Sequence, residues 1–306
     1  MSEQGGVITR HIISIGDFDR NEIDSLLDHA RQIDQKKYDK NALYGKILAT
    51  LFFEPSTRTR MSFESAMARL GGTSLSVGSV EACSIAKGET LADTVRVVSG
   101  YADAIVIRHP KEGAARLAAE FATVPVINAG DGAGQHPSQT LLDLYTIRQS
   151  IPIDNIDIAL IGDLRYGRTA HSLASALSLY GARLHTISPK GLELPATLTT
   201  ELSEKGMEIV EHESINDVIG DLDVLYVTRI QRERFPDSAS YFNVASDYRI
   251  TPELLASAKD HLIVLHPLPR VDEIDPRVDE LPYARYFEQS RNGVPVRMAM
   301  LLRVIQ

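Results

Sequence analysis

Short apolar segments alternate with helical patterns along the sequence, and this alternation limits the fold more than any other feature. Most of the apolar segments are rich in β-branched residues and apolar throughout, which suits strands buried on both faces of a parallel sheet. They lie at 46–53, 73–79, 103–108, 124–130, 156–163, 182–188, 207–212, 223–229 and 262–269. The alternation predicts an α/β fold with mainly parallel sheets flanked by helices.

The pattern also indicates two domains. Helical periodicity occupies the intervening segments 59–70, 91–102, 113–122, 138–149, 168–181 and 195–206. A link containing Pro152, at 148–155, separates one long helical pattern from a fresh strand and is the best internal boundary. We predict domains at 1–149 and 150–290. The last helix, 291–306, has a wide apolar face that must be buried, and we expect it to pack back onto the first domain.

Composition excludes several classes of protein. A formal net charge of −9 and a pI of about 5.5 argue against a nucleic-acid binder, which usually has a basic excess. The single cysteine, Cys83, excludes an internal disulfide, and no Cys/His cluster has the spacing of a metal site. There is no pattern of a signal peptide and no apolar run near the roughly 18 residues of a membrane span. We therefore expect a cytoplasmic protein that binds no metal, nucleic acid or membrane.

Polar and charged side chains follow one predicted strand after another. In an open parallel sheet, ligands bind at the carboxyl ends of the strands. The set comprises Glu54 to Thr59, Arg108, His109, the segment 131–139, Arg168, Arg229, Gln231, and His266 to Arg270. We predict that these residues face one cleft between the two domains.

The segment Ser56-Thr57-Arg58-Thr59 stands where a strand ends and a helix begins. A helix N-terminus offers unpaired N–H groups and a positive dipole end, the hydroxyls add donors, and a guanidinium suits two phosphate oxygens. The segment is typical of an anion site. The alternative is structural: Ser56 or Thr57 caps the helix, and Arg58 points into solvent.

A second helix start, at Gln135 to Gln139, repeats this pattern. Pro137 suits the first helical position, and His136 is placed to donate a hydrogen bond to a carbonyl oxygen that gains charge. A capping histidine is the alternative. In the loop before 91–102, Thr90 and Asp93 match a capping box, which leaves Lys87 unexplained except as a solvated lysine.

Two nucleotide-binding motifs are absent. The segment 162–169, GDLRYGRT, lacks the G-x-G-x-x-G pattern, and its bulky residues oppose close approach to a pyrophosphate. The chain also has no G-x-x-x-x-G-K-[ST] loop, so nucleotide hydrolysis is not expected. Arg168, at the start of the next helix, is instead suited to clamping a carboxylate.

Five motifs together resemble one family. STRTR, RHP, QHPSQTLLDL, GDLRYGRT and HPLPR occur in the order typical of the carbamoyltransferases, and the resemblance extends from about RHIISI to the last helix. The HPLP segment and the VTRIQRER loop are similar to the aspartate type. The ornithine type typically has His-Cys-Leu-Pro in place of HPLP.

The resemblance implies attack of the L-aspartate α-amine on carbamoyl phosphate, which gives N-carbamoyl-L-aspartate and phosphate in pyrimidine biosynthesis, without a cofactor. It assigns catalytic roles to Arg58, Thr59, Lys87, Arg108 and His136. The resemblance implies that carbamoyl phosphate is bound by these residues together with Ser56, Thr57, Ser84, Gln139, Pro267 and Leu268. It assigns aspartate to Lys87, Arg168, Arg229 and Gln231.

The resemblance also implies partners. Ser84 and Lys87 would reach into the site of a neighbouring subunit of a homotrimer. The resemblance leaves open whether a zinc-containing regulatory chain also binds. The same residues disfavour two other functions. A carbamoyltransferase for ornithine or another amine is disfavoured because Arg168 and Arg229 would repel a cation. A non-catalytic anion-binding homologue is disfavoured because it has no need of Arg58, Lys87, Arg108 and His136 together.

Overall fold

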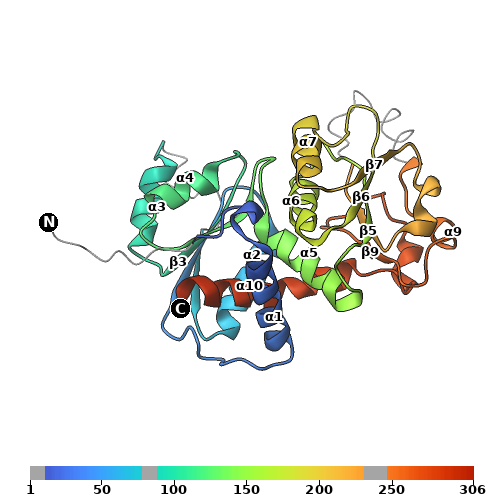
Figure 1. Ribbon diagram of the computed structural model, residues 1–306. Coiled ribbons are helices and arrows are strands. Elements are labelled where there is room, and N and C mark those ends of the chain that lie inside the picture. The colour runs from blue at the N-terminus through green and yellow to red at the C-terminus, as the bar shows by residue number, and fades with distance from the viewer. Residues whose placement is uncertain (1–10, 78–87, 231–246) are drawn as a thin grey trace. The chain divides into compact units, whose positions relative to one another are not determined.

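Two parallel sheets, each with its own helices, are seen in the computed structural model, which describes residues 11–77, 88–230 and 247–306 (Figure 1). The chain divides into unit 1, which runs up to Ser138 and includes Val294–Gln306, and unit 2, Gln139–Gly293. The predicted fold class is confirmed, since both sheets are parallel throughout and carry helices between their strands.

The sheet of unit 1 has the strand order β2-β1-β3-β4. Its strands are β1 (Ile47–Phe52), β2 (Thr73–Ser76), β3 (Ala104–His109) and β4 (Val126–Asp131). β1 lies in the interior of the sheet with every residue after Ile47 buried, whereas β2 is an edge strand whose side chains are mostly exposed. The pairing of Phe52 with Arg108 brings the carboxyl ends of β1 and β3 to the same edge.

Along the chain this sheet is accompanied by α1 (Arg20–Asp34), α2 (Thr57–Arg69), α3 (Leu91–Ser99) and α4 (Ala114–Phe121), and α5 (Pro137–Ser150) begins in unit 1 and continues in unit 2. α3 and α4 pack against one another (Figure 1). Thr90 caps α3 by accepting a hydrogen bond from the Asp93 amide at 3.1 Å, which is the N-cap half of the predicted capping box. α1 was not anticipated, although Asp19 and Glu22 form a capping box at its start.

The sheet of unit 2 has the order β7-β6-β5-β8-β9. Its strands are β5 (Asp157–Ile161), β6 (Arg183–Ile187), β7 (Ile209–His212), β8 (Val224–Val227) and β9 (Ile263–Leu265), and its helices are α6 (Arg168–Leu177), α7 (Ala196–Glu204) and α9 (Pro252–Leu255). Short 3-10 turns of unit 2 lie at Ser178–Tyr180, Ile215–Asp217, Ile219–Asp221 and Pro276–Glu280, and one in unit 1 lies at Ile15–Asp17. Buried aliphatic residues of β5, β8 and β9 form the core beneath the strand ends.

The final helix, α10 (Tyr286–Ile305), begins at Tyr286 rather than at residue 291 as predicted. Pro295 lies inside it, where a proline removes one backbone hydrogen bond and usually marks a helix start in a sequence. Its residues from Val294 onward belong to unit 1. There Arg303 bonds to Glu22 of α1 at 2.9 Å.

Candidate active site

The first group of predicted residues lies at the carboxyl ends of β1 and β3 in unit 1. The guanidinium of Arg108 donates to the Glu54 carboxylate at 3.1 Å and to the Ala129 carbonyl at 3.2 Å. Only 11% of the Arg108 side chain is exposed, against 33% for Glu54. The arginine therefore spans the ends of three adjacent strands, and a carboxylate occupies one face of its guanidinium.

The anion-type segment forms the first turn of α2. Ser56 takes the N-cap position, but its side chain makes no capping hydrogen bond, contrary to the structural alternative. Thr59 is buried, and Arg58 is exposed with no ion pair to a carboxylate among the described residues. Partial burial nevertheless lowers the pKa of Arg58, because water solvates its guanidinium incompletely. An anion at this helix end would find donors that the fold itself does not use.

The loop after β4 positions His136 at the start of α5. Asp131 accepts hydrogen bonds from the amides of Gly113 and Gln135 and from the Asn128 side chain, so this loop is tied to two neighbouring segments. His136 is 4% exposed, and its Nδ1 lies 3.4 Å from the Ser138 hydroxyl. The His136 ring is therefore buried beside the Ser138 hydroxyl rather than lying at the surface.

A second group of predicted residues follows the strands of unit 2. Arg168 begins α6, after β5, and Arg229 follows β8, the neighbouring strand. Gly162 allows the ends of these two strands to approach. Its φ is +115°, and a Cβ there would lie 2.4 Å from the Thr228 carbonyl oxygen. A side chain at residue 162 would therefore push the Arg229 segment away.

The segment after β9 carries Pro267 and Leu268 and is held by a buried hydrogen bond between a histidine and a carboxylate. His266 Nε2 lies 2.7 Å from Glu273, and His266 Nδ1 accepts the Leu268 amide at 2.8 Å. Burial, the largest single influence, raises the pKa of Glu273, but the hydrogen bond from His266 and those from backbone amides together bring the pKa below its usual value. Leu268 has a positive φ of 56°, a conformation that a leucine adopts only where surrounding contacts impose it.

Gln139 is fixed by a buried carboxylate on its own helix. Its Nε2 donates to Asp143 Oδ1 at 2.8 Å. Gln139 is 8% exposed, and Asp143 is completely buried. The motif that predicted Gln139 contains Asp143 as well, but nothing in the sequence showed that the two side chains meet.

Three predicted residues, Ser84, Lys87 and Gln231, lie outside the described residues. The structure brings together Ser56 to Thr59 with Arg108 and His136 in unit 1, and Arg168 with Arg229, Pro267 and Leu268 in unit 2, at the carboxyl edge of each sheet. Glu54 belongs to the set predicted at the strand ends, whereas Asp143 and Glu273 were not predicted as part of the site. Asp143 lies within the motif QHPSQTLLDL, but Glu273 lies outside the five motifs, and no pattern in the sequence pointed to it.

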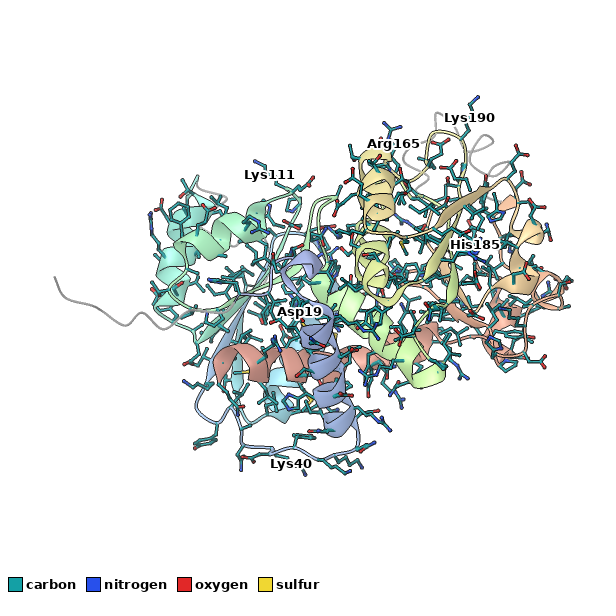
Figure 2. The ribbon with its side chains drawn as sticks, in the orientation of Figure 1. Asp19, Lys40, Lys111, Arg165, His185 and Lys190 are labelled. Carbon is teal, nitrogen blue, oxygen red and sulfur yellow. The ribbon has the colours of Figure 1, made fainter. Side chains whose placement is uncertain are left out.

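The histidines left without a role in the sequence have structural partners. His185, labelled in Figure 2, bonds through Nδ1 to His212 Nε2 at 2.9 Å and through Nε2 to Asp157 at 3.2 Å. His171 Nε2 lies 2.7 Å from the Leu164 carbonyl oxygen. These contacts explain the histidines without recourse to catalysis.

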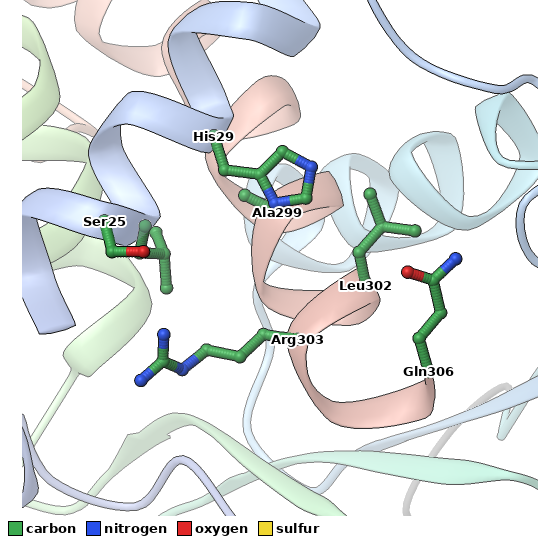
Figure 3. Close-up of a pocket in the computed structure, with 7 residues that line it drawn as sticks. Ser25, His29, Ala299, Leu302, Arg303 and Gln306 are labelled. Atoms are coloured by element: carbon green, nitrogen blue, oxygen red, sulfur yellow. The ribbon is translucent and has the colours of Figure 1, made fainter.

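A pocket of about 230 Å³ lies within unit 1, away from the strand ends. Ser25, Leu26 and His29 of α1 line it together with Ala299, Leu302 and Arg303 of α10 and Gln306 (Figure 3). None of the residues predicted from the sequence lines it, so the pocket is no part of the candidate site.

Two other features are absent from residues 11–77, 88–230 and 247–306. No helix there is long and apolar enough to cross a membrane. Within the same ranges, no three His, Cys, Asp or Glu side chains gather as a metal-binding group.

Two family models match the chain. The model described as the carbamoyl-P binding domain of aspartate/ornithine carbamoyltransferase matches residues 10–149, and that of the Asp/Orn binding domain matches residues 154–304. The chain belongs to the aspartate/ornithine carbamoyltransferase family, and it is therefore a transferase, as the motifs predict.

Relatives specify the aspartate type. The aspartate carbamoyltransferase catalytic subunit of Methanoculleus marisnigri is 73% identical over 97% of this chain and 99% of the relative, and that of Methanospirillum hungatei is 68% identical over 96% and 99%. The catalytic subunit of M. jannaschii aspartate transcarbamoylase superposes with a TM-score of 0.91 at 54% identity, covering 96% of this chain and 97% of that one.

A ligand-bound structure is also similar. Aspartate transcarbamoylase from Trypanosoma cruzi, in complex with carbamoyl phosphate and aspartate, has a TM-score of 0.90 at 41% identity and covers 97% of this chain and 95% of that one. The predicted resemblance to the aspartate type is confirmed.

Proposed function

We propose that this chain transfers the carbamoyl group of carbamoyl phosphate to the α-amine of L-aspartate, giving N-carbamoyl-L-aspartate and phosphate. One observation carries the proposal beyond the comparisons. Both sheets end in arginines at their carboxyl edges, Arg58 and Arg108 in unit 1 and Arg168 and Arg229 in unit 2. Two anionic substrates require such cationic positions in a chain whose net charge is −9.

Unit 1 supplies the phosphate contacts. The hydroxyls of Ser56, Thr57 and Thr59, the first amides of α2 and the Arg58 guanidinium surround the phosphate at the positive end of the helix. Ser84 and Lys87 of a neighbouring subunit complete this group. The absence of a capping bond from Ser56 supports the assignment, because its hydroxyl is left for a ligand.

The carbonyl of carbamoyl phosphate faces Thr59, Arg108 and His136. When the aspartate nitrogen bonds to the carbonyl carbon, the oxygen gains negative charge, and these three groups stabilise it. The carbon–oxygen bond to phosphate then breaks, and phosphate departs with the bonding electron pair. A donor to a developing oxyanion typically contributes on the order of 3 kcal/mol to lowering the barrier.

Unit 2 supplies the contacts to aspartate and to the carbamoyl NH2. Arg168 takes the α-carboxylate, and Arg229 with Gln231 takes the side-chain carboxylate. Lys87 of the neighbouring subunit also contacts aspartate. Gln139 and the backbone carbonyls of Pro267 and Leu268 accept hydrogen bonds from the carbamoyl NH2.

The proton lost by the attacking amine passes to the departing phosphate. The motifs contain no evident carboxylate that would act as a general base. A phosphate dianion is basic enough near neutral pH to accept the proton. A pH–rate profile set by one enzyme carboxylate, and abolished by its replacement, would contradict this step.

We further propose a homotrimer with shared sites. The exposed edge strand β2 and the exposed apolar side chains of Tyr44, Met61, Leu75 and Tyr101 in unit 1 support an interface. Mixing Lys87→Ala and Arg58→Ala variants tests it. Recovered activity in the mixture requires one intact site built from two chains.

The remaining assignments follow from the reaction. We propose that the product enters pyrimidine biosynthesis, that the protein is cytoplasmic, and that domains 1–149 and 150–290 each serve one substrate. The direct test of the function is to offer the purified protein carbamoyl phosphate with aspartate or with ornithine, and to measure phosphate and carbamoylated product. Carbamoylation of ornithine, or none at all with aspartate, would overturn the proposal.

A further inference from the structure

Asp143 is the centre of a buried hydrogen-bond network in unit 2. Its Oδ1 accepts Gln139 Nε2 at 2.8 Å and Gln289 Nε2 at 2.6 Å, and its Oδ2 accepts the Tyr226 hydroxyl at 2.9 Å. Asp143 and Tyr226 are completely buried, and Gln289 is 1% exposed. Three donors therefore meet one carboxylate out of contact with water.

The direction of each hydrogen bond is set by chemistry. A carboxylate only accepts, so each glutamine must turn its NH2 toward Asp143. Burial, and then the neighbouring Asp143 carboxylate, holds the pKa of Tyr226 well above its usual value. The Tyr226 hydroxyl therefore remains protonated and donates a hydrogen bond to Oδ2.

A planar amide carries its oxygen on the side opposite its NH2. With its NH2 held by Asp143, Gln139 must present Oε1 on its other side, where it accepts hydrogen bonds and cannot donate them. In the same way Gln289 presents Oε1, which accepts the His266 amide at 2.9 Å. That bond fixes the backbone immediately before Pro267 and Leu268.

We propose that Asp143 is a positioning residue for the groups that hold the carbamoyl NH2, which are Gln139 and the backbone of Pro267 and Leu268. By orienting them, Asp143 makes this part of the site specific for an amide. It orients Gln139 Oε1 and, through Gln289, the carbonyls of residues 267 and 268, so that only acceptors face the carbamoyl NH2. The inference rests on the proposed function, because that function places the NH2 at these groups. Asp143 itself touches no substrate.

The consequence is discrimination between NH2 and a group of similar size. Acetyl phosphate has the phosphate and the carbonyl of carbamoyl phosphate but carries a methyl group in place of NH2. A methyl group leaves the oriented acceptors unpaired, and an unpaired buried polar group is unfavourable enough to weaken binding about tenfold or more. Without Asp143, the Gln139 amide is free to turn, and the discrimination is lost.

The test measures binding of carbamoyl phosphate and of acetyl phosphate to the full chain by calorimetry. The wild type is expected to bind carbamoyl phosphate about tenfold or more tightly. Asp143→Leu is expected to reduce this ratio to within about threefold, chiefly by weakening carbamoyl phosphate. A purely structural role would weaken both ligands together and leave the ratio unchanged.

Tyr226→Phe is the matched control. It removes the hydrogen bond to Asp143 and the one to Thr169 but leaves both glutamine amides held, so the ratio should stay at the wild-type value. If Asp143→Leu does not fold, Asp143→Ser also removes the carboxylate and should lower the ratio in the same direction.

Two results would overturn the inference: a folded Asp143 variant with the wild-type ratio, or an equal loss in Tyr226→Phe. Failure of the proposed function is separate. It would appear as no transfer to aspartate by the wild type, whatever the ratio of the two binding constants.

Discussion

Replacing Arg58 with alanine should abolish most activity while leaving the fold intact. The side chain is exposed and pairs with no carboxylate among the described residues, so its removal frees no buried partner. Substitutions of this kind usually change the free energy of unfolding by less than about 0.5 kcal/mol. Loss of a guanidinium that stabilises transferring charge raises the barrier by about 3 kcal/mol, which is on the order of a 100-fold loss of kcat/KM.

Arg108→Ala is the informative comparison. Arg108 is largely buried, and it donates to Glu54 at 3.1 Å and to the Ala129 carbonyl at 3.2 Å. Its removal should cost activity to a similar degree and also about 1–3 kcal/mol of stability, since hydrogen bonds of a charged group are lost. The Glu54 end of the pair is partly exposed, which places the cost toward the lower value.

Phosphate release at varied carbamoyl phosphate measures activity, and thermal unfolding followed by circular dichroism measures stability. For domains of this size, about 1 kcal/mol corresponds to a shift of about 2–4 °C in Tm. Arg58→Ala should therefore melt within about 2 °C of the wild type, and Arg108→Ala clearly below it. A large fall in the Tm of Arg58→Ala, or near-wild-type turnover by it, would refute the reasoning.

Three further outcomes are expected. Arg229→Ala should raise the KM for aspartate at least tenfold with little change for carbamoyl phosphate, and equal effects in steady-state kinetics would contradict its assignment. Gly162→Ala should destabilise the chain by roughly 2–4 kcal/mol in urea unfolding, because a side chain collides with the Thr228 carbonyl at a positive φ; an unchanged midpoint would be inconsistent with this. The Tm should fall as pH drops below the unfolded histidine pKa of 6.5, since burial lowers the folded pKa of four histidines and the unfolded chain binds more protons. They are His11, His29, His109 and His212. A Tm that rises between pH 7 and 5 would count against this sign.

The sequence by itself determined the class of fold. Apolar runs such as 156–163 indicate strands that are buried on both faces, whichever segments pack against them. The reason is that the hydrophobicity of each side chain is a local property of the sequence. The turn chemistry at Ser56 to Thr59 and at Gln135 to Gln139 marks helix starts that follow strands, and both were located correctly. These are local signals, and they do not depend on which segments later meet.

Only the tertiary structure decided which side chains act on one another. Glu54 and Arg108 lie far apart in the sequence, as do Asp143 and Gln289, yet each pair is joined by a hydrogen bond. The order of the strands brings such residues together, and no periodicity encodes it. The sequence also placed the start of α10 at residue 291 rather than at Tyr286, because Pro295, which lies inside the helix, is a residue that favours a helix start nearby.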